Sequence, residues 1–352
     1  MRMKAAILVG KERFDVREID RPECGLGEVL VRVKVCAVCG TDLRIFRGQK
    51  RVDVPITGHE ISGVVEDIGE GVKDLSPGDK VVIETVVGCG ECNACKMGEE
   101  NRCRRKYKAI GYQYNGGFAQ FLLMPENAVK QGCVIKIPDH LSFEEASIVE
   151  PFSCVINGWS PFKDRPTGFT AVVIGAGIIG MLHTEYAKQK AAKAILVNRS
   201  APRLILAQKI GLPADEFVDA SRCDPVRRVR ELTEGLGADV IVCAASSKDA
   251  QKQAIEMAAV DADISFFAGI PKDDPYVAVN TNLIHYNEIH VHGANASHRR
   301  QYLEALDLIA SGRVDVKKFI THKFPLEKIE EALHTLQDRR LNAIKVLIDP
   351  WL

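Results

Sequence analysis

The first 150 residues contain short stretches in which hydrophobic and polar positions alternate. Alternation with a period of two is typical of strands that bury one face, and Val and Ile are frequent in these stretches. Turn-forming sequences separate them, including Gly69-Glu70-Gly71 and Pro77-Gly78-Asp79. The predicted strands are residues 4–9, 14–19, 29–35, 61–68 and 80–85. This part of the chain therefore predicts an antiparallel β-sheet or barrel.

From about residue 168 the pattern changes to runs that are hydrophobic at every position, separated by stretches with helical periodicity. The predicted strands are 170–174, 194–197, 240–243, 264–267 and 289–292, and the predicted helices between them are 181–190, 203–210 and 249–259. Alternating buried strands and helices predict a parallel, doubly wound sheet. Further helices are predicted at 301–311 and 326–337, with a last strand at 343–348.

The chain length indicates more than one domain. It has 352 residues, whereas single hydrophobic cores stop growing at about 250–300 residues. We therefore expect boundaries near residues 153 and 293. Lys and Arg together number 47, as do Asp and Glu, so no overall positive field favours nucleic-acid binding. No hydrophobic run approaches the roughly 18 residues of a membrane span, and the N-terminal run is too short for a signal peptide. We expect a cytoplasmic protein that binds neither nucleic acid nor membranes.

A glycine-rich turn follows the predicted strand 170–174 and opens a helix. It consists of Gly175, Ala176, Gly177, Ile178, Ile179 and Gly180. In dinucleotide-binding proteins such glycines allow a tight turn, close approach of the pyrophosphate and close packing of helix on strand, while the helix N-terminus directs N–H groups at the phosphates. A glycine-rich turn without function is the alternative, but the strand–turn–helix context favours dinucleotide binding.

The next strand indicates which dinucleotide is preferred. A carboxylate at its end would accept a hydrogen bond from the ribose 2′-OH of NAD. Here the strand ends at Asn198, with Arg199 directly after it and Arg203 one helical turn later. A guanidinium can bind a 2′-phosphate with two hydrogen bonds, so we expect NADP to be preferred over NAD. The alternative is that Arg199 is solvated and stacks on adenine, so that both cofactors are used.

Four of the eleven cysteines are clustered in the sequence, at Cys89, Cys92, Cys95 and Cys103. A disulfide framework would suit a small secreted domain rather than a chain of this length. Four thiolates from one loop can enclose a tetrahedral zinc ion without an open position, so such a site is structural. An iron–sulfur cluster is the competing interpretation, because cysteine spacing alone does not identify the metal.

A second group of potential ligands is spread more widely. Cys39 lies about twenty residues before His59 and Glu60, and Glu150 lies near the expected domain boundary. A thiolate, an imidazole and carboxylates form a mixed ligand set, and three protein ligands with a displaceable water are typical of catalytic zinc. On their own these residues are only suggestive.

The order of these motifs resembles the zinc-containing medium-chain dehydrogenase/reductase family, in particular its sorbitol (polyol) dehydrogenase-like branch, with threonine dehydrogenases as near relatives. The matching motifs are CGTD at 39–42, GHE at 58–60, the four-cysteine cluster, Glu150-Pro151, GAGIIG at 175–180 and THKFPLEK at 321–328. The resemblance spans essentially the whole chain. It implies a GroES-like β-barrel catalytic domain at 1–153 with a structural-zinc lobe at 88–104, a Rossmann cofactor domain at 154–293 and a C-terminal return to the catalytic domain at 294–352.

The resemblance also implies roles for individual residues. By position, Cys39, His59 and Glu60 match the catalytic zinc ligands, and Glu150 matches a fourth or water-bridged ligand. Asp42 matches a carboxylate that orients the zinc-binding imidazole. Thr41 matches the hydroxyl that passes the alcohol proton onward. The family likeness further implies two zinc ions per subunit, reversible hydride transfer between a secondary alcohol and NAD(P), and a homodimer or homotetramer.

The chain departs from the family pattern at several positions. Arg44 replaces a His that serves as the outer proton relay in many relatives, and since Arg does not titrate near neutral pH we expect ribose and water to replace it. Ile45 and residues 295–297 differ from the aromatic residue and the Phe-Arg-Tyr of polyol dehydrogenases at substrate-facing positions. The resemblance implies a small-molecule substrate that is a polyol, sugar or sugar acid, or its ketone. The departures at the substrate-facing positions argue against sorbitol itself.

Three alternatives concern the substrate site and the activity. Phe46, Phe118 and Asn157 either line the substrate site or belong to the framework. L-Threonine or another amino alcohol is the alternative substrate. A non-catalytic NADP(H)-binding sensor is the alternative from a different class, although the intact ligand set argues against it.

Overall fold

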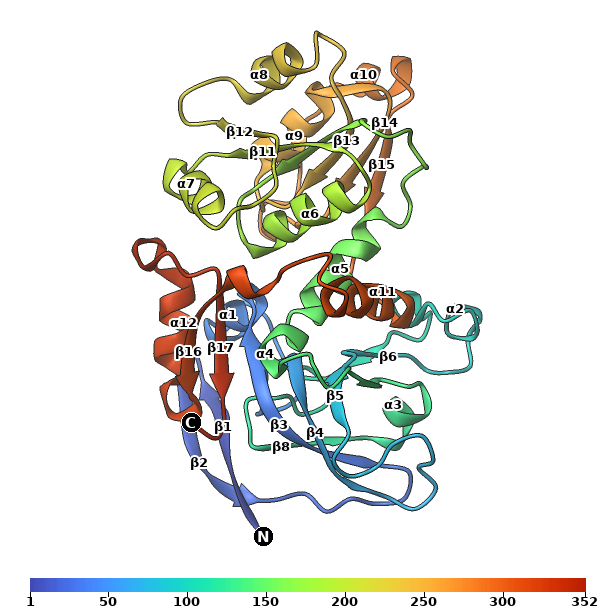
Figure 1. The fold of residues 1–352 in the computed structure, drawn as a ribbon, viewed down its shortest axis with the longest axis vertical. Coiled ribbons are helices and arrows are strands. Elements are labelled where there is room, and N and C mark those ends of the chain that lie inside the picture. Colours follow the sequence, from blue (N-terminus) through green and yellow to red (C-terminus); the bar gives the residue numbers. More distant parts are fainter. The chain divides into compact units, whose positions relative to one another are not determined.

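A computed structural model describes the backbone of residues 1–352 and the side chains of all of them except Arg339. The chain divides into two compact units (Figure 1). The first unit consists of Met1–Ser153 and Ala296–Leu352, and the second consists of Cys154–Asn295. None of the helices in the described residues has the length and apolar character needed to cross a bilayer.

The second unit is built on a parallel sheet. Within residues 154–295, all described, six strands lie in the order β12-β11-β10-β13-β14-β15. They are β10 (Thr170–Ile174), β11 (Lys193–Asn198), β12 (Glu216–Asp219), β13 (Ala238–Cys243), β14 (Ala258–Phe266) and β15 (His290–Gly293). The predicted doubly wound sheet is confirmed. The strand order reverses between β10 and β13, and in sheets of this kind ligands bind beside the carboxyl ends of the strands at that point.

Helices connect these strands and cover the sheet. They are α6 (Ile178–Gln189), α7 (Ala201–Lys209), α8 (Pro225–Leu232), α9 (Lys248–Glu256) and α10 (Thr281–Tyr286). Helix α6 packs on β10 and β11, whereas α8 and α10 both pack on α9. Because the sheet is covered on both faces, its central strands are buried at consecutive positions, as at Val172, Val173, Ile241 and Val242.

One boundary in this unit differs from the prediction. Helix α9 ends at Glu256 rather than at residue 259, and β14 begins at Ala258 rather than at residue 264. Ala258 pairs with Ala238 of β13, and Asp261 has a left-handed backbone (φ 60°) that a helix does not allow. Pairing with the neighbouring strand therefore overrides the helix propensity of this alanine-rich segment.

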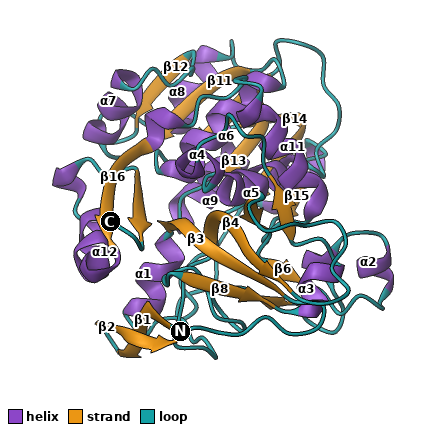
Figure 2. Cartoon of the chain, turned by 60° about the horizontal axis from the view of Figure 1, so that its bottom comes forward, coloured by secondary structure: helices purple, strands orange, loops and turns teal.

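The first unit is built on a mostly antiparallel sheet with the strand order β16-β17-β3-β4-β5-β9, and β8 also pairs with β3 (Figures 1 and 2). The strands are β3 (Val29–Val38), β4 (Glu60–Ile68), β5 (Lys80–Ile83), β8 (Phe121–Met124), β9 (Val134–Lys136), β16 (Ile320–Pro325) and β17 (Lys345–Asp349). Strands β1 (Arg2–Gly10) and β2 (Arg13–Asp20) form an antiparallel pair, as do the short β6 (Val86–Val87) and β7 (Lys108–Ala109). Strand β5 ends two residues before the predicted 85, and the Thr85 N–H binds the hydroxyl of Tyr302 instead.

Helices of the first unit are mostly short. They are α1 (Gly40–Phe46), α2 (Asn93–Lys96), α3 (Glu126–Lys130), α4 (Phe143–Ala146), α11 (Arg299–Ala310) and α12 (Ile329–Gln337), and α5 (Val149–Trp159) crosses the division between the units. The predicted helix 326–337 begins as a 3₁₀ turn, Leu326–Lys328, before α12. Phe46 and Phe118 are fully buried in the hydrophobic core of this unit, so they are framework residues, and Asn157 is buried on α5.

Candidate active site

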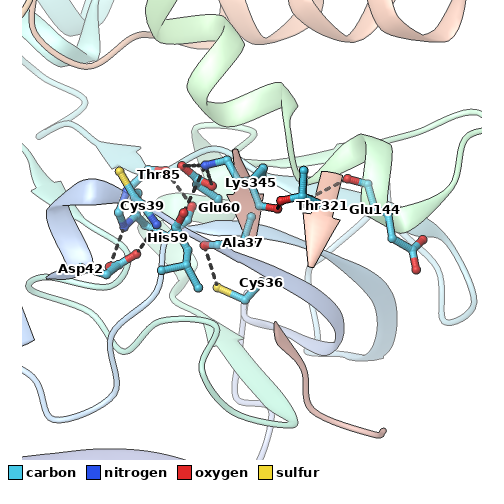
Figure 3. A network of polar contacts seen from close by, with 12 residues as sticks. Cys36, Ala37, Cys39, Asp42, His59, Glu60, Thr85, Glu144, Thr321 and Lys345 are labelled. Carbon is cyan, nitrogen blue, oxygen red and sulfur yellow. Dashed lines mark hydrogen bonds and ion pairs between the residues drawn. The ribbon is translucent and has the colours of Figure 1, made fainter. Parts of the chain in front are cut away.

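Cys39, His59 and Glu60 lie together at one end of the main sheet of the first unit. Their ligand atoms are all within 4.8 Å of one another, with His59 and Glu60 buried and Cys39 partly exposed. Cys39 directly precedes α1, and His59 and Glu60 stand at the start of β4 (Figure 3). A sulfur, an imidazole nitrogen and a carboxylate at this spacing form a donor set that suits Zn²⁺.

Asp42 connects the two segments that carry these donors. One of its carboxylate oxygens accepts a hydrogen bond from the Cys39 N–H at 2.8 Å, and the other lies 3.3 Å from Nδ1 of His59. Asp42 is only 2% exposed. A proton on Nδ1 that faces this carboxylate leaves Nε2 of His59 as the ring nitrogen available to a metal.

Gly58 allows the chain to enter β4 at this point. Its φ is +90°, and a Cβ atom would lie 2.7 Å from Sγ of Cys36 and 2.9 Å from the ring of Phe118. A side chain at this position would displace core atoms as well as strain the backbone. Glycine is therefore needed to bring His59 beside Cys39.

Lys345, which the sequence analysis did not identify, is the counterion of Glu60. Its Nζ lies 2.6 Å and 2.9 Å from the two carboxylate oxygens of Glu60, and it donates to Val38 O at 3.3 Å (Figure 3). Lys345 is 1% exposed and Glu60 is 0% exposed. Burial alone lowers the pKa of Lys345, but the charges of Glu60 and Cys39 raise it overall. A lysine inside the hydrophobic run at 343–348 was the sequence signal that could have revealed it.

Tyr112 was also missed. Its hydroxyl lies 3.4 Å from both ring nitrogens of His59, and the two ring centroids are 5.2 Å apart. Burial raises the pKa of Tyr112 although the nearby His59 opposes this rise, so the phenol stays protonated. Nothing in the local sequence distinguished Tyr112 from Tyr114, because their difference depends on contact with a distant strand.

Thr41 and Glu150 take different places around this group. Thr41 lies on α1 between Cys39 and Asp42 and is partly exposed. Glu150 is buried on α5. Among the described side chains, the group whose ligand atoms lie within 4.8 Å of one another is Cys39, His59 and Glu60, and it does not include Glu150. Its role as a fourth or water-bridged ligand therefore stays a prediction.

The four clustered cysteines lie around one small space. The Sγ–Sγ distances are 3.5 Å for Cys92–Cys95 and 3.9 Å for both Cys89–Cys95 and Cys92–Cys103. Zinc–sulfur bonds of about 2.3 Å in a tetrahedron place the sulfurs about 3.8 Å apart, and a disulfide requires about 2.05 Å. Backbone N–H groups of Cys95 and Arg104 lower the pKa of Cys92 to about 6, whereas burial raises the pKa of Cys95 to about 12, so the distances rather than the pKa values indicate a metal site. The geometry therefore suits a single tetrahedral ion.

The glycine-rich turn joins β10 to α6 in the second unit. Gly175 has a φ of +116°, and a Cβ atom on Gly180 would lie 1.7 Å from the carbonyl oxygen of Gly175. Gly177 caps α6, and no atom lies within 4 Å of its Cβ position. Gly180 is thus required for packing, whereas the open space at Gly177 permits close approach of a pyrophosphate to the start of α6. Ile178 and Ile179 form the first turn of the helix.

Asn198 holds this turn in place. Its Oδ1 accepts a hydrogen bond from the Ala176 N–H at 3.1 Å, and its Nδ2 donates to Ser200 O at 3.0 Å. Arg199 directly after it is exposed, and Arg203 is partly buried on α7. The end of β11 therefore presents a neutral amide and a guanidinium where NAD-binding proteins carry a carboxylate.

Comparisons with known proteins agree with this architecture. Residues 25–139 match the model of the alcohol dehydrogenase GroES-like domain, and residues 179–311 match that of the zinc-binding dehydrogenases. The chain is 30% identical to D-arabitol-phosphate dehydrogenase of Enterococcus avium, over 97% of this chain and 95% of that protein. It is 30% identical to sorbitol dehydrogenase of Bacillus subtilis (99% and 97%). It is 32% identical to L-threonine 3-dehydrogenase of Thermococcus kodakarensis (91% and 90%).

Solved structures show the same fold over the whole chain. A Sinorhizobium meliloti protein described as a candidate zinc-binding dehydrogenase, bound to NADP, has a TM-score of 0.89 at 28% identity, covering 99% of this chain and 100% of that one. An alcohol dehydrogenase of Escherichia coli complexed with NADH has a TM-score of 0.88 at 27% identity, covering 99% of both chains. The expected GroES-like and Rossmann folds are therefore confirmed. The chain belongs to the zinc-containing medium-chain dehydrogenase/reductase family, on its polyol dehydrogenase branch, and is a zinc-dependent alcohol dehydrogenase.

Proposed function

We propose that this dehydrogenase oxidises a secondary alcohol of a polyol, sugar or sugar acid to the ketone, in a reversible reaction. The observation that carries the proposal is the group Cys39, His59 and Glu60, whose donor atoms lie within 4.8 Å of one another. Polyol and polyol-phosphate dehydrogenases among the relatives support the substrate class. L-Threonine is the second candidate substrate, because a threonine dehydrogenase is 32% identical to the chain.

In this proposal Cys39, His59 and Glu60 hold the catalytic zinc, with Glu150 as a fourth or water-bridged ligand. When bound, zinc polarises the alcohol oxygen as a Lewis acid and the nicotinamide accepts the hydride. Asp42 fixes the orientation and the tautomer of His59 through the 3.3 Å contact with Nδ1. Thr41, two residues after Cys39, takes up the alcohol proton and passes it toward ribose and water, because Arg44 cannot serve as a base.

The cofactor is proposed to be NADP rather than NAD. Gly175, Gly177 and Gly180 form the pyrophosphate turn with the first residues of α6, Ile178 and Ile179. The amide of Asn198 does not repel a 2′-phosphate, and Arg199 and Arg203 supply cations beside it. One similar structure was solved with NADP and another with NADH, so the comparisons support either nicotinamide cofactor.

The second zinc of each chain is proposed to lie among Cys89, Cys92, Cys95 and Cys103. Four thiolates leave no open coordination position, so this ion serves the structure of the lobe rather than catalysis. The homodimer or homotetramer implied by the family stays a prediction.

Zinc content and steady-state kinetics test the function together. The purified protein should contain two zinc ions per chain and should reduce NADP⁺ with polyols faster than with L-threonine. A higher kcat/KM for NADP⁺ than for NAD⁺ would support the role of Arg199. Cys39→Ser should lose the activity and one zinc while it remains folded, and Cys24→Ser, a change at a thiol outside both groups, should keep both.

Three outcomes would contradict parts of the proposal. Activity with L-threonine and none with polyols would replace the substrate class. Equal or better use of NAD⁺ would remove the cofactor preference. A protein that holds a single zinc ion and oxidises no alcohol would be a binding protein on this fold rather than an enzyme.

A further inference from the structure

The hydroxyl of Tyr112 lies inside the candidate active site without a satisfactory hydrogen-bond partner. Among the side chains that the structure describes, its contacts are with the two ring nitrogens of His59, each at 3.4 Å. Hydrogen bonds of good geometry are usually about 2.7–3.2 Å long, and one hydroxyl cannot bond both nitrogens well. Tyr112 is partly exposed, so a group that enters the site can reach this hydroxyl.

His59 cannot serve as that partner in the working enzyme. Its Nδ1 faces the carboxylate of Asp42 at 3.3 Å, and the remaining nitrogen is the one proposed to hold zinc. Both ring nitrogens are thus committed to other groups. The hydroxyl of Tyr112 can therefore still donate one hydrogen bond to, and accept hydrogen bonds from, a group that enters the site.

The position of Tyr112 is built into the fold. Gly111, just before it, has a φ of +81°, and a Cβ atom there would lie 2.6 Å from the carbonyl oxygen of Gly58. The carbonyl of Tyr112 accepts from the Asp53 N–H at 2.8 Å. Lys50 places its Nζ 4.4 Å from the centroid of the Tyr112 ring. The loop is thus packed directly against the residue that precedes His59.

We propose that Tyr112 binds the substrate through a hydrogen bond to a hydroxyl on the carbon next to the reacting carbon. This inference rests on the proposed function, in which the reacting oxygen lies beside His59. The phenol of Tyr112 lies beside His59. It can therefore reach the substituent on the next carbon of the substrate as well as the reacting oxygen. Tyr112 therefore selects vicinal diols and longer polyols over alcohols that lack the second hydroxyl, because such alcohols cannot form this hydrogen bond.

The test compares 2,3-butanediol with 2-butanol, which differ by this one hydroxyl. Tyr112→Phe should lower kcat/KM for 2,3-butanediol about 10- to 100-fold and change that for 2-butanol less than about threefold. Calorimetry should show weaker binding of the diol to the cofactor-loaded variant, with unchanged zinc content. Tyr114→Phe is the matched control, because this tyrosine lies in the same loop, packs against the core and beneath Lys108, and should leave both substrates unaffected.

Each outcome decides the proposal. An equal loss for diol and monoalcohol at full zinc content would make Tyr112 a structural residue, and no loss for the diol would remove the contact. If Tyr112→Phe weakened L-threonine but not the diol, the recognised group would be an ammonium rather than a hydroxyl, and the proposal would be wrong. A wild-type protein that oxidised no alcohol would instead overturn the proposed function. Calorimetry with 2,3-butanediol and 2-butanol would still decide whether Tyr112 binds the second hydroxyl.

Discussion

Lys345 and Glu60 form an ion pair with almost no access to water. Each charge of the pair compensates the other, so removal of one partner leaves an isolated charged group in the core. Glu60 is also a proposed zinc ligand, so Lys345 and the metal attract the same carboxylate. The ammonium therefore stabilises the metal-free site and at the same time opposes the binding of a second cation.

Replacement of Lys345 by methionine should lower the stability of the metal-free protein and raise its affinity for zinc. In metal-free Lys345→Met the free energy of unfolding should fall by about 3–5 kcal/mol, because Glu60 is left unpaired. The affinity of the Cys39 site for zinc should rise about tenfold or more, because a neighbouring positive charge is gone. Denaturant unfolding of chelator-treated protein measures the first effect, and competition with a chromophoric zinc chelator measures the second.

Lys323 provides a matched control on the adjacent strand β16. It pairs with Glu144 and Asp349 at 3.0 and 2.9 Å, but its side chain is 36% exposed. Lys323→Met should change the free energy of unfolding by no more than about 1 kcal/mol and leave zinc affinity unaltered. Weaker zinc binding in Lys345→Met would show that Lys345 positions Glu60 for the metal rather than competing with it.

At the scale of single elements, helix α6 is unusual because it buries a histidine. His183 is 0% exposed, and its Nδ1 accepts a hydrogen bond from the indole N–H of Trp159, the last residue of α5, at 3.0 Å. Among the described residues, its Nε2 has no partner. Burial lowers the pKa of His183 to about 3, so the folded protein keeps this imidazole neutral.

The neutral His183 predicts a loss of stability in mild acid. The unfolded chain binds a proton below about pH 6.5, whereas the folded chain does so only near pH 3. The contribution of this group is therefore fully present above pH 6.5 and is lost as the pH falls toward 3, at about 1.4 kcal/mol per pH unit. His183→Asn keeps an acceptor near the position of Nδ1 but does not titrate.

Unfolding measurements between pH 7 and pH 5 test this expectation. The free-energy difference between wild type and His183→Asn should shift in favour of the variant as the pH falls. His285→Asn on helix α10 is the control, because His285 is exposed and should show no such trend. A constant difference between wild type and His183→Asn would mean that the folded and unfolded chains take up the proton of His183 at the same pH, which would contradict this expectation.

At the scale of the whole molecule, the two candidate metal groups differ in how they are enclosed. The cysteine lobe surrounds its space with four sulfurs from one short segment, of which Cys95 and Cys103 are buried. The group at Cys39, His59 and Glu60 brings three donors from two separate segments and is proposed to keep a displaceable position. The two metals should therefore leave the protein under different conditions.

A strong chelator should remove zinc in two stages. The first ion should leave with the activity while the far-ultraviolet circular dichroism stays unchanged, because an open site admits the chelator. The second should leave only with thiol modification or unfolding, since no coordination position of the lobe is free. Zinc per chain and activity, followed together over time, measure this, and simultaneous loss of both ions would contradict the assignment of a closed site.

Much of the fold follows from patterns that act over a few residues. Alternating positions identified the strands of the first unit, and continuous hydrophobic runs identified the parallel sheet of the second. The cysteine lobe and the glycine-rich turn are local as well, because each is a single segment whose spacing already carries its geometry. The boundary of α9 and β14 was wrong because Ala258 takes its conformation from pairing with Ala238, which a local propensity does not include.

The sequence by itself therefore determined the two sheet types, the cysteine group, the dinucleotide turn and, through family resemblance, the residues Cys39, His59 and Glu60. Only the tertiary structure decided what surrounds those residues. Lys345 reaches Glu60 across 285 positions because β17 pairs with β3, with Val346 opposite Val38. Tyr112 reaches His59 because Gly111 packs against Gly58. Such contacts depend on strand register and close packing between distant segments, and no pattern within either segment contains them.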